Sequence, residues 1–243
     1  MDHDCSRPRL SRISTPWSLV RLAHGSSEAD AASARRLLIQ RYCGAVYRYL
    51  QGALRDEEAA LDLFQEFVLR LLRGDFRRAD PAAGRFRDYL RRALVHLVND
   101  HHRQQRRRPQ SLPANIAVVA ATDGPDGEID FLHSWREELV SRAWEALAAA
   151  KPTYYAVLAF HVDSPELPSA RVAAELTGQL GKSFTANQVR VTLHRARQRF
   201  AELLLREVAD SLGDFTEAEL IEELRACKLL KLCGAALLKR RTS

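Results

Sequence analysis

The chain has 243 residues, of which 46% are hydrophobic, and this is enough for one or two domains with true cores. It carries 37 Lys and Arg against 31 Asp and Glu, a formal charge of +6 that favours a polyanionic partner without identifying one. No apolar run approaches the length of a membrane span, the first residues are too polar for a secretory signal, and the 4 cysteines lack metal-ligand spacing. The composition therefore predicts a cytoplasmic protein with reduced cysteines and without a membrane segment, a metal or a cofactor.

The first part of the chain reads as helical. Residues 1–27 are expected to be loosely ordered, apart from a short amphipathic piece at about 17–22. Apolar residues then recur at helical spacing, and no segment forms a convincing strand. Helices are predicted at about 28–52, at 56–72, and from about 85 into the basic run that Pro109 ends.

Acidic and basic residues are segregated between the second and third of these helices. Residues 56–66 hold five acids and no base, whereas residues 73–108 hold eleven Arg and four Asp. The acids at the start of the second helix suit the positive end of its dipole. Two surfaces of opposite charge favour two different partners.

The composition changes after Pro109. Residues 110–130 contain Pro and Gly and no basic residue, which is typical of a flexible linker. Helical patterns follow, and the last of them either packs against the preceding helices or forms a regulatory arm. These patterns lie at 131–149, 152–161, 169–180, 185–212 and 216–232.

The sequence QVRVTLHRARQRF, from Gln188 onward, places a basic face on a helix with an apolar stripe. Thr185 and Gln188 fit the capping box, so this helix is predicted to begin at Thr185. A short apolar helix and a turn with Gly178 and Gly181 precede it, and this order predicts a helix-turn-helix whose second helix enters the major groove of DNA. The alternative is a core helix with a solvated basic face.

Patterns for nucleotide binding and for catalysis are incomplete. TGQLGKS resembles the end of a phosphate-binding loop, but the first glycine and the preceding strand of that motif are missing. His96, His101 and His102 match neither HExxH nor a Cys/His zinc pattern, and no Ser or Cys lies in a recognisable nucleophile turn. The sequence therefore predicts a protein that is not an enzyme. The alternative from another class is a nucleic-acid-processing enzyme that uses His101 and His102, which needs a metal or a perturbed histidine pair.

Three stretches resemble bacterial RNA polymerase sigma factors of the extracytoplasmic-function group. RDEEAALDLFQEFVLRLL is similar to the acidic helix of region 2, GRFRDYLRRALVHLVNDHHRQQRRR to the helix that reads and opens the −10 element, and NQVRVTLHRARQRF to the region 4 recognition helix. The turn before the last stretch is several residues longer than the common family form. The resemblance covers about residues 36–206 and implies an all-α protein of two helical modules joined by a flexible linker, the second with the helix-turn-helix, plus a C-terminal helical tail. The implied parts are a loosely ordered 1–27, a region 2-like domain 28–109, the linker 110–130, a region 4-like domain 131–212 and a C-terminal extension 213–243.

The resemblance implies a transcription initiation factor without enzymatic activity. Such a protein binds core RNA polymerase, through the β′ clamp helices and the β subunit, and directs it to specific promoters. It recognises and helps to melt the −10 element and reads the −35 element. An anti-sigma factor is a further partner that the resemblance allows. The alternative is a stand-alone helix-turn-helix regulator that binds duplex DNA without polymerase, which leaves the acidic helix unexplained.

The family motifs also imply site residues. Phe86 is expected in the core, whereas Tyr89 either packs there or stacks on a base. Arg190 is expected at a guanine edge and Val191 at a thymine methyl, and Arg197 either contacts DNA or covers the core with its methylene stem. The implied polymerase contacts are Asp62, Gln65 and Glu66. The implied −10 contacts are Tyr89, Arg91, Arg92, His96, Asp100, Arg103, Arg106, Arg107 and Arg108. The implied −35 contacts are Thr185, Asn187, Gln188, Arg190, Val191, His194, Arg195 and Arg197.

Overall fold

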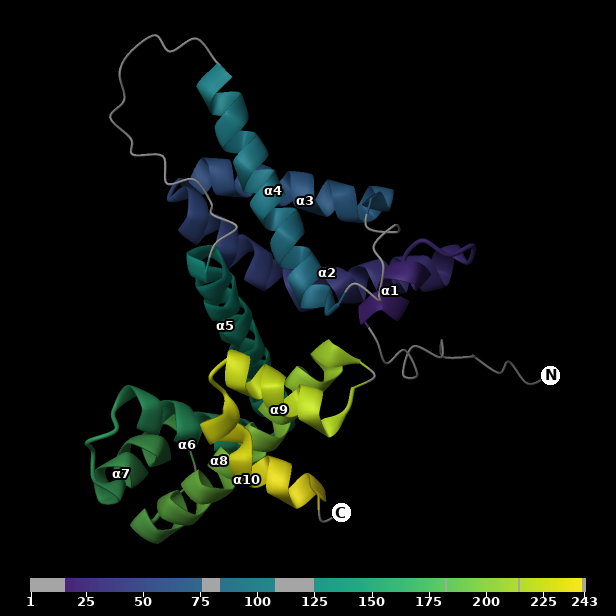
Figure 1. The fold of residues 1–243 in the computed structure, drawn as a ribbon. Coiled ribbons are helices and arrows are strands. Elements are labelled where there is room, and N and C mark those ends of the chain that lie inside the picture. Colours follow the sequence, from purple (N-terminus) through teal and green to yellow (C-terminus); the bar gives the residue numbers. More distant parts are fainter. Residues whose placement is uncertain (1–15, 76–83, 108–124, 182, 214, 242–243) are drawn as a thin grey trace, which may run out of the picture. The chain divides into compact units, whose positions relative to one another are not determined.

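The computed structural model describes residues 16–75, 84–107, 125–181, 183–213 and 215–241 (Figure 1). Within these ranges every regular element is an α-helix and no strand occurs, which confirms the all-α fold class. No helix in the described part of the chain is long and apolar enough to cross a membrane. The predicted linker residues 110–124 and the first fifteen residues lie outside the described ranges.

The helices divide into two compact units. The first contains Met1–Glu138 and Asp210–Thr216, and the second contains Leu139–Ala209 and Glu217–Ser243. Both units are therefore discontinuous in sequence, and the division falls within one helix, α5 (Pro125–Ala150).

The first unit is built on three long helices. Asp56 Oδ1 accepts a hydrogen bond from the Ala59 amide at 3.1 Å, and this cap begins α3 one residue after the predicted start. The helix ends at Gly74, whose φ of 88° is open to glycine without strain. α4 packs across α2 and α3 (Figure 1). The helices of this unit before α5 are α1 (Pro16–Leu22), α2 (Glu28–Leu54), α3 (Glu57–Arg73) and α4 (Phe86–Arg107).

Aromatic rings form the centre of the first unit's core. Tyr42 of α2 packs edge-on against Phe86 of α4, with ring centroids 4.8 Å apart, and stacks on Trp135 of α5 at 5.5 Å. Phe131 continues the series from Trp135 to Tyr49. Such ring pairs add stability beyond the area that they bury. The first part of α5 therefore contributes side chains to this core, as α2 and α4 do.

The start of α5 differs from the sequence prediction. The helix begins at Pro125, inside the segment 110–130 that was predicted to be a linker. Proline suits the first position of a helix, where its missing N–H is not needed. Pro and Gly were interpreted as linker residues, although here they stand at a helix start.

The second unit contains the remainder of α5 and five further helices. Trp144 of α5 contacts Phe200 of α8 and Tyr155 of α6, with ring centroids 4.8 and 5.7 Å apart. Arg142 and Glu207 form an ion pair at 3.0 Å. The five helices are α6 (Pro152–Asp163), α7 (Ser169–Leu180), α8 (Ala186–Leu212), α9 (Glu217–Ala226) and α10 (Leu230–Arg241).

The C-terminal tail forms two helices where one segment, 216–232, was predicted. Lys228 has a left-handed φ of 55°, and the Leu229 amide donates to the Leu224 carbonyl at 2.7 Å, which closes α9. Lys239 of α10 donates to Glu202 of α8 at 2.8 Å. The tail thus packs within the second unit, which is one of the two alternatives that the sequence left open.

Candidate nucleic-acid interface

The outer face of α3 carries the acidic residues predicted to contact a partner. Asp62 and Gln65 are exposed, as expected for a binding surface. Glu66 is half-buried, and its Oε1 accepts a hydrogen bond from Arg70 Nε at 2.8 Å. Glu66 therefore has a basic partner in its own helix. An i,i+4 pair of this kind partly compensates the carboxylate charge, so Asp62 is the less compensated acid.

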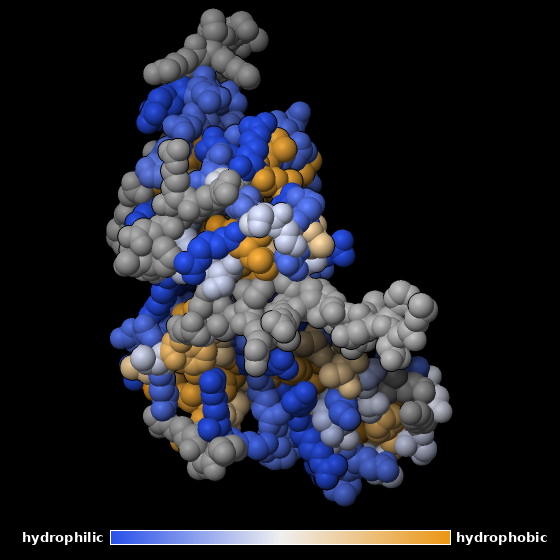
Figure 2. All heavy atoms as spheres, turned by 90° about the vertical axis from the view of Figure 1, so that its right-hand side faces the viewer, coloured by the Kyte–Doolittle hydropathy of each residue, from blue (hydrophilic) through white to orange (hydrophobic). Residues whose placement is uncertain are grey.

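Three leucines of α3 were missed by the sequence reasoning. Leu61, Leu69 and Leu72 are 45%, 44% and 39% exposed, although each is a large apolar residue. They share the outer side of the helix with Asp62 and Gln65 because 61, 65, 69 and 72 are spaced by four, four and three residues. Figure 2 shows that hydrophobic areas lie between hydrophilic ones on the face of the molecule that it presents. The signal was the excess of leucine in LDLFQEFVLRLL, which has more apolar residues than one buried stripe requires.

Phe86 and Tyr89 lie at the start of α4. Phe86 is buried, as expected, and its ring stacks on that of Tyr89 at 6.3 Å. Tyr89 is only half-buried, and the edge of Trp17 meets its ring at 5.6 Å. Burial, and secondly the charge of Asp75, raise the pKa of Tyr89, so its hydroxyl keeps its proton. Tyr89 thus belongs partly to the core and partly to the surface.

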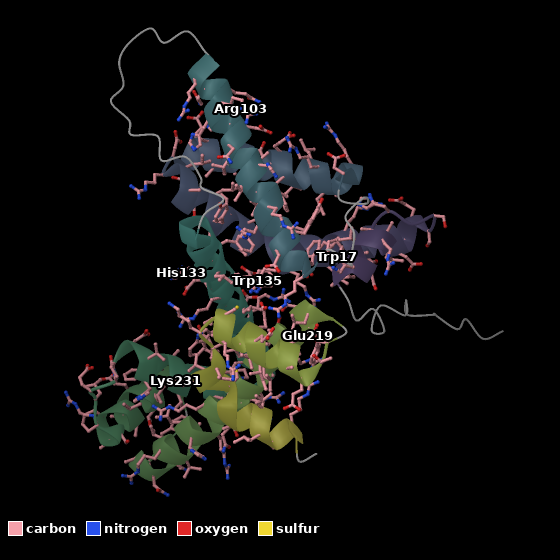
Figure 3. The ribbon with its side chains drawn as sticks, in the orientation of Figure 1. Trp17, Arg103, His133, Trp135, Glu219 and Lys231 are labelled. Atoms are coloured by element: carbon pink, nitrogen blue, oxygen red, sulfur yellow. The ribbon has the colours of Figure 1, made fainter. Side chains whose placement is uncertain are left out.

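The exposed basic residues of α4 lie on the side away from its buried stripe, whereas Arg87 and Arg91 lie nearer the stripe. His96, Arg92 and Arg106 are exposed, and Arg91 is half-buried. Arg103 lies near the C-terminal end of the helix (Figure 3) and forms an ion pair with Asp100 at 3.2 Å. The side chain of Arg107 and all of Arg108 lie outside the described residues. The described basic side chains therefore gather along one helix rather than in a pocket.

His101 and His102 are neighbours on the same helix, with ring centroids 5.9 Å apart. His102 Nε2 is buried and has no hydrogen-bond partner among the described residues. Burial lowers the pKa of His102, and the adjacent His101 and Arg106 lower it further. The described residues contain no group of three or more His, Cys, Asp or Glu that could hold a metal ion. The lowered pKa of His102 thus follows from burial and neighbouring groups, and the described residues offer no metal-ligand group beside it.

In the second unit, the start of α8 has the predicted capping box. The Thr185 amide donates to Gln188 Oε1 at 2.8 Å, and the Gln188 amide donates to Thr185 Oγ1 at 3.2 Å. Both side-chain oxygens are thus engaged at the helix end, which leaves the Gln188 NH₂ to donate elsewhere. Asn187 is exposed beside them.

The turn between α7 and α8 is fixed by Thr177. Its Oγ1 donates to the Ala173 carbonyl at 2.7 Å and accepts from the Phe184 amide at 3.0 Å. Gly181 ends α7 with a φ of 62°. These contacts tie the end of α7 to Phe184, just before α8, and so hold the longer turn. The core beneath it joins α6, α7 and α8 through Val157, Val172, Ala173, Leu176 and Val189.

The exposed side of α8 presents the residues predicted to contact DNA. Arg190, Val191, His194 and Arg195 are all exposed. Arg197 is exposed too, and its Nη2 lies 2.6 Å from His161 Nε2 of α6. Because a guanidinium can only donate, the His161 nitrogen is the acceptor of this contact. Arg197 therefore has a side-chain partner that neither of its two predicted roles included.

One part of the chain matches a known protein family. Residues 38–108 match the family model described as Sigma-70 region 2. Comparison with curated proteins and with solved structures gave no match. The matched segment contains α3, α4 and the second part of α2, whereas α1, α5 and the whole second unit lie outside it. The match over this segment supports membership of the sigma factor family. It likewise supports a role in transcription initiation that involves RNA polymerase, promoter DNA and the −10 element.

Proposed function

We propose that the chain is a sigma factor of the extracytoplasmic-function group, with a C-terminal extension, that directs core RNA polymerase to specific promoters. One observation carries the proposal. The segment that matches Sigma-70 region 2 contains both the acidic and apolar face of α3 and the basic face of α4. A protein of this kind works by binding alone, with no catalytic step and no cofactor of its own.

The polymerase surface is the outer face of α3. Asp62, Gln65 and Glu66 correspond to the family positions that meet the β′ clamp helices. The exposed leucines Leu61 and Leu69 beside them supply apolar area that a partner would bury. Burial of such leucines contributes affinity, and the acids select a basic partner surface. An α3 face of this composition has no use in a stand-alone duplex-binding regulator.

The −10 surface is the exposed side of α4. Arg92, Arg103 and Arg106 stand in a row that suits the phosphates of an opened duplex, and such contacts supply affinity rather than sequence preference. Tyr89 has an exposed part on which an unstacked base can stack. His96 is exposed on the same helix and would meet a base edge or a phosphate.

The −35 surface is the exposed side of α8, which acts as the second helix of a helix-turn-helix. The capping box directs the first turn and the positive end of the helix dipole toward the DNA. Arg190 can pair with guanine through two hydrogen bonds, and Val191 can meet a thymine methyl. His194 and Arg195, one turn further on, suit phosphates.

The test compares two double variants in binding to core polymerase. Asp62→Ala with Leu69→Ala should weaken the affinity by about tenfold or more, because few interface residues carry most of the binding energy. The matched control, Leu37→Ala with Gln40→Ala, removes an exposed leucine and an exposed polar residue from α2 and should leave the affinity unchanged. Both variants should stay within about 0.5 kcal/mol of the parent in free energy of unfolding, since the changed residues are exposed.

Two outcomes would contradict the proposal at different levels. Equal affinity of both double variants would remove α3 as the docking face. A parent chain that neither binds core polymerase nor supports promoter-specific transcription would remove the proposed function itself.

A further inference from the structure

α1 lies outside the segment that matches Sigma-70 region 2, yet it contacts the start of α4. The Trp17 ring meets Phe86 at a centroid distance of 5.1 Å and an interplanar angle of 86°. It also meets Tyr89 at 5.6 Å and 61°. Trp17 is therefore in edge contact with both aromatic residues at the beginning of the −10 helix.

A polar contact adds to these ring contacts. Trp17 Nε1 donates a hydrogen bond to the Gly84 carbonyl at 3.3 Å. Gly84 has a φ of 124°, a backbone conformation that favours glycine, and it stands two residues before α4. The Asp88 and Tyr89 amides both donate to the next carbonyl along, that of Arg85. Trp17 thus holds the backbone that enters α4 as well as the ring of Tyr89.

α1 itself is anchored, so it can serve as a support. Leu19, Val20 and Ala23 are buried, and α1 packs against α2. Trp17 of α1 contacts the first turn of α4, and Figure 3 shows it near the N-terminal end of that helix. Phe86 is buried, whereas Tyr89 and Trp17 are both half-buried, and the Tyr89 ring contacts the rings of both Trp17 and Phe86.

Preorganisation explains why such a support matters. A base that leaves the duplex stacks on an aromatic ring only if the ring is held in a suitable orientation, because ordering it during binding costs entropy. Phe86 and Trp17 restrict the Tyr89 ring from two sides before DNA arrives. Removing Trp17 would leave Tyr89 in place but with more orientations.

We propose that Trp17 is a positioning residue for promoter recognition, which orients Tyr89 to receive an unstacked base of the −10 element. The inference rests on the proposed function and adds α1 to the DNA-reading surface. The direct base contact belongs to Tyr89, and Trp17 acts through it.

The experiment uses the full chain assembled with core polymerase on a duplex promoter. Trp17→Leu keeps apolar packing but removes the ring, and it should reduce open-complex formation by about tenfold. Trp17→Phe keeps a ring edge without the donor to Gly84, and it should stay within about threefold of the parent. A fluorescent adenine analogue at the −10 base should be quenched less by the Trp17→Leu protein, since less of it stacks on Tyr89.

Two readouts separate positioning from mere support of the fold. Core polymerase affinity should be unchanged in Trp17→Leu, because α3 is a different surface. In a Tyr89→Ala background, Trp17→Leu should add less than about twofold, since residues that act as one unit are not additive. A loss that adds in full to that of Tyr89→Ala, or a Trp17→Leu protein that opens promoters like the parent, would overturn the inference.

Failure of the inference is distinguishable from failure of the proposed function. If Tyr89→Ala opens promoters as well as the parent, Tyr89 does not receive the base and Trp17 has nothing to position, but the chain still acts with polymerase. If the parent chain and polymerase together open no promoter, the proposed function fails first.

Discussion

At the scale of single residues, burial and a nearby carboxylate together make the thiol of Cys43 in the first unit unreactive. Glu138 of α5 is buried, and Arg48 of α2 donates to its Oε2. Cys43 lies on the same helix as Arg48, and the charge of Glu138 acts on its thiol. Burial, and secondly the charge of Glu138, raise the pKa of the Cys43 thiol to about 11. The thiol is therefore protonated and a poor nucleophile at neutral pH.

We expect this thiol to make stability depend on pH in alkaline solution. The unfolded chain releases the Cys43 proton near the ordinary pKa of 9.0, whereas the folded chain keeps it up to about 11. Between these values the unfolded state binds fewer protons, so the free energy of unfolding falls as pH rises, by at most about 1.4 kcal/mol per pH unit for one thiol. Urea unfolding from pH 8.5 to 10.5 should show a smaller fall for Cys43→Ala than for the parent, to about that extent.

Other alkaline titrations are common to the two proteins and cancel in that comparison. Cys233 has a pKa raised to about 12 by burial and keeps its share of the slope in both. Identical slopes for parent and variant would show that Cys43 ionises alike in the folded and unfolded chain.

At the scale of helices, Gly44 permits the close approach of α2 and the first part of α5. A Cβ at this position would overlap Glu138 Oε2 and lie 2.8 Å from Glu138 Cδ. The carboxylate cannot simply move aside, because it is buried and bound to Arg48. Gly52, eight residues further along the same helix, has open space around it.

Substituting these two glycines should therefore change stability in opposite directions. Gly44→Ala should lower the free energy of unfolding by about 1–3 kcal/mol, as overpacking does, and by more if the ion pair breaks. Gly52→Ala should raise it by up to about 1 kcal/mol, since alanine is the better helix former. Chemical denaturation followed by circular dichroism measures both. Equal shifts in the same direction would mean that α5 does not pack on Gly44.

Helix positions were largely predictable because local signals determine them. Asp56 and Thr185 are capping residues, and both helices begin within one residue of the predicted place. The two failures have local causes as well. α5 begins at a proline that was interpreted as a linker residue, and the tail breaks at Lys228, where no glycine marks the left-handed turn.

Contacts between distant residues were not predictable in the same way. Periodicity identifies the apolar face of a helix but not what that face will meet. The approach of Trp17 to Phe86, and that of Gly44 to Glu138, join residues far apart in sequence. At the candidate site, the exposure of Asp62 and Arg190 was as expected. The Glu66–Arg70 pair was open to prediction from its i,i+4 spacing, but the contact of Arg197 with His161 was not.

At the scale of the whole molecule, the compact units do not follow the order of the chain. The first unit includes Asp210–Thr216, which begins at the end of α8. The second unit includes the tail from Glu217 onward. The segment that matches Sigma-70 region 2 is only a part of the first unit, whose core also needs Trp135. A fragment cut at the limits of the match would lose core residues, so experiments on this protein should use the full chain.

The tail should be a structural part of the second unit and not an independent arm. Leu224 of α9 is 0% exposed, whereas Leu238 of α10 is 62% exposed, so the two leucines form a matched pair. Leu224→Ala should destabilise the second unit by about 2–5 kcal/mol, as truncation of a core leucine does. Leu238→Ala should stay within about 0.5 kcal/mol of the parent. Amide hydrogen exchange can report each unit separately, because stability is not uniform along a chain. We expect Leu224→Ala to speed amide exchange in α8 between Ala201 and Ala209, while α2 exchanges as in the parent. Unchanged exchange in α8 would show that the tail folds independently of the helix that carries the −35 surface.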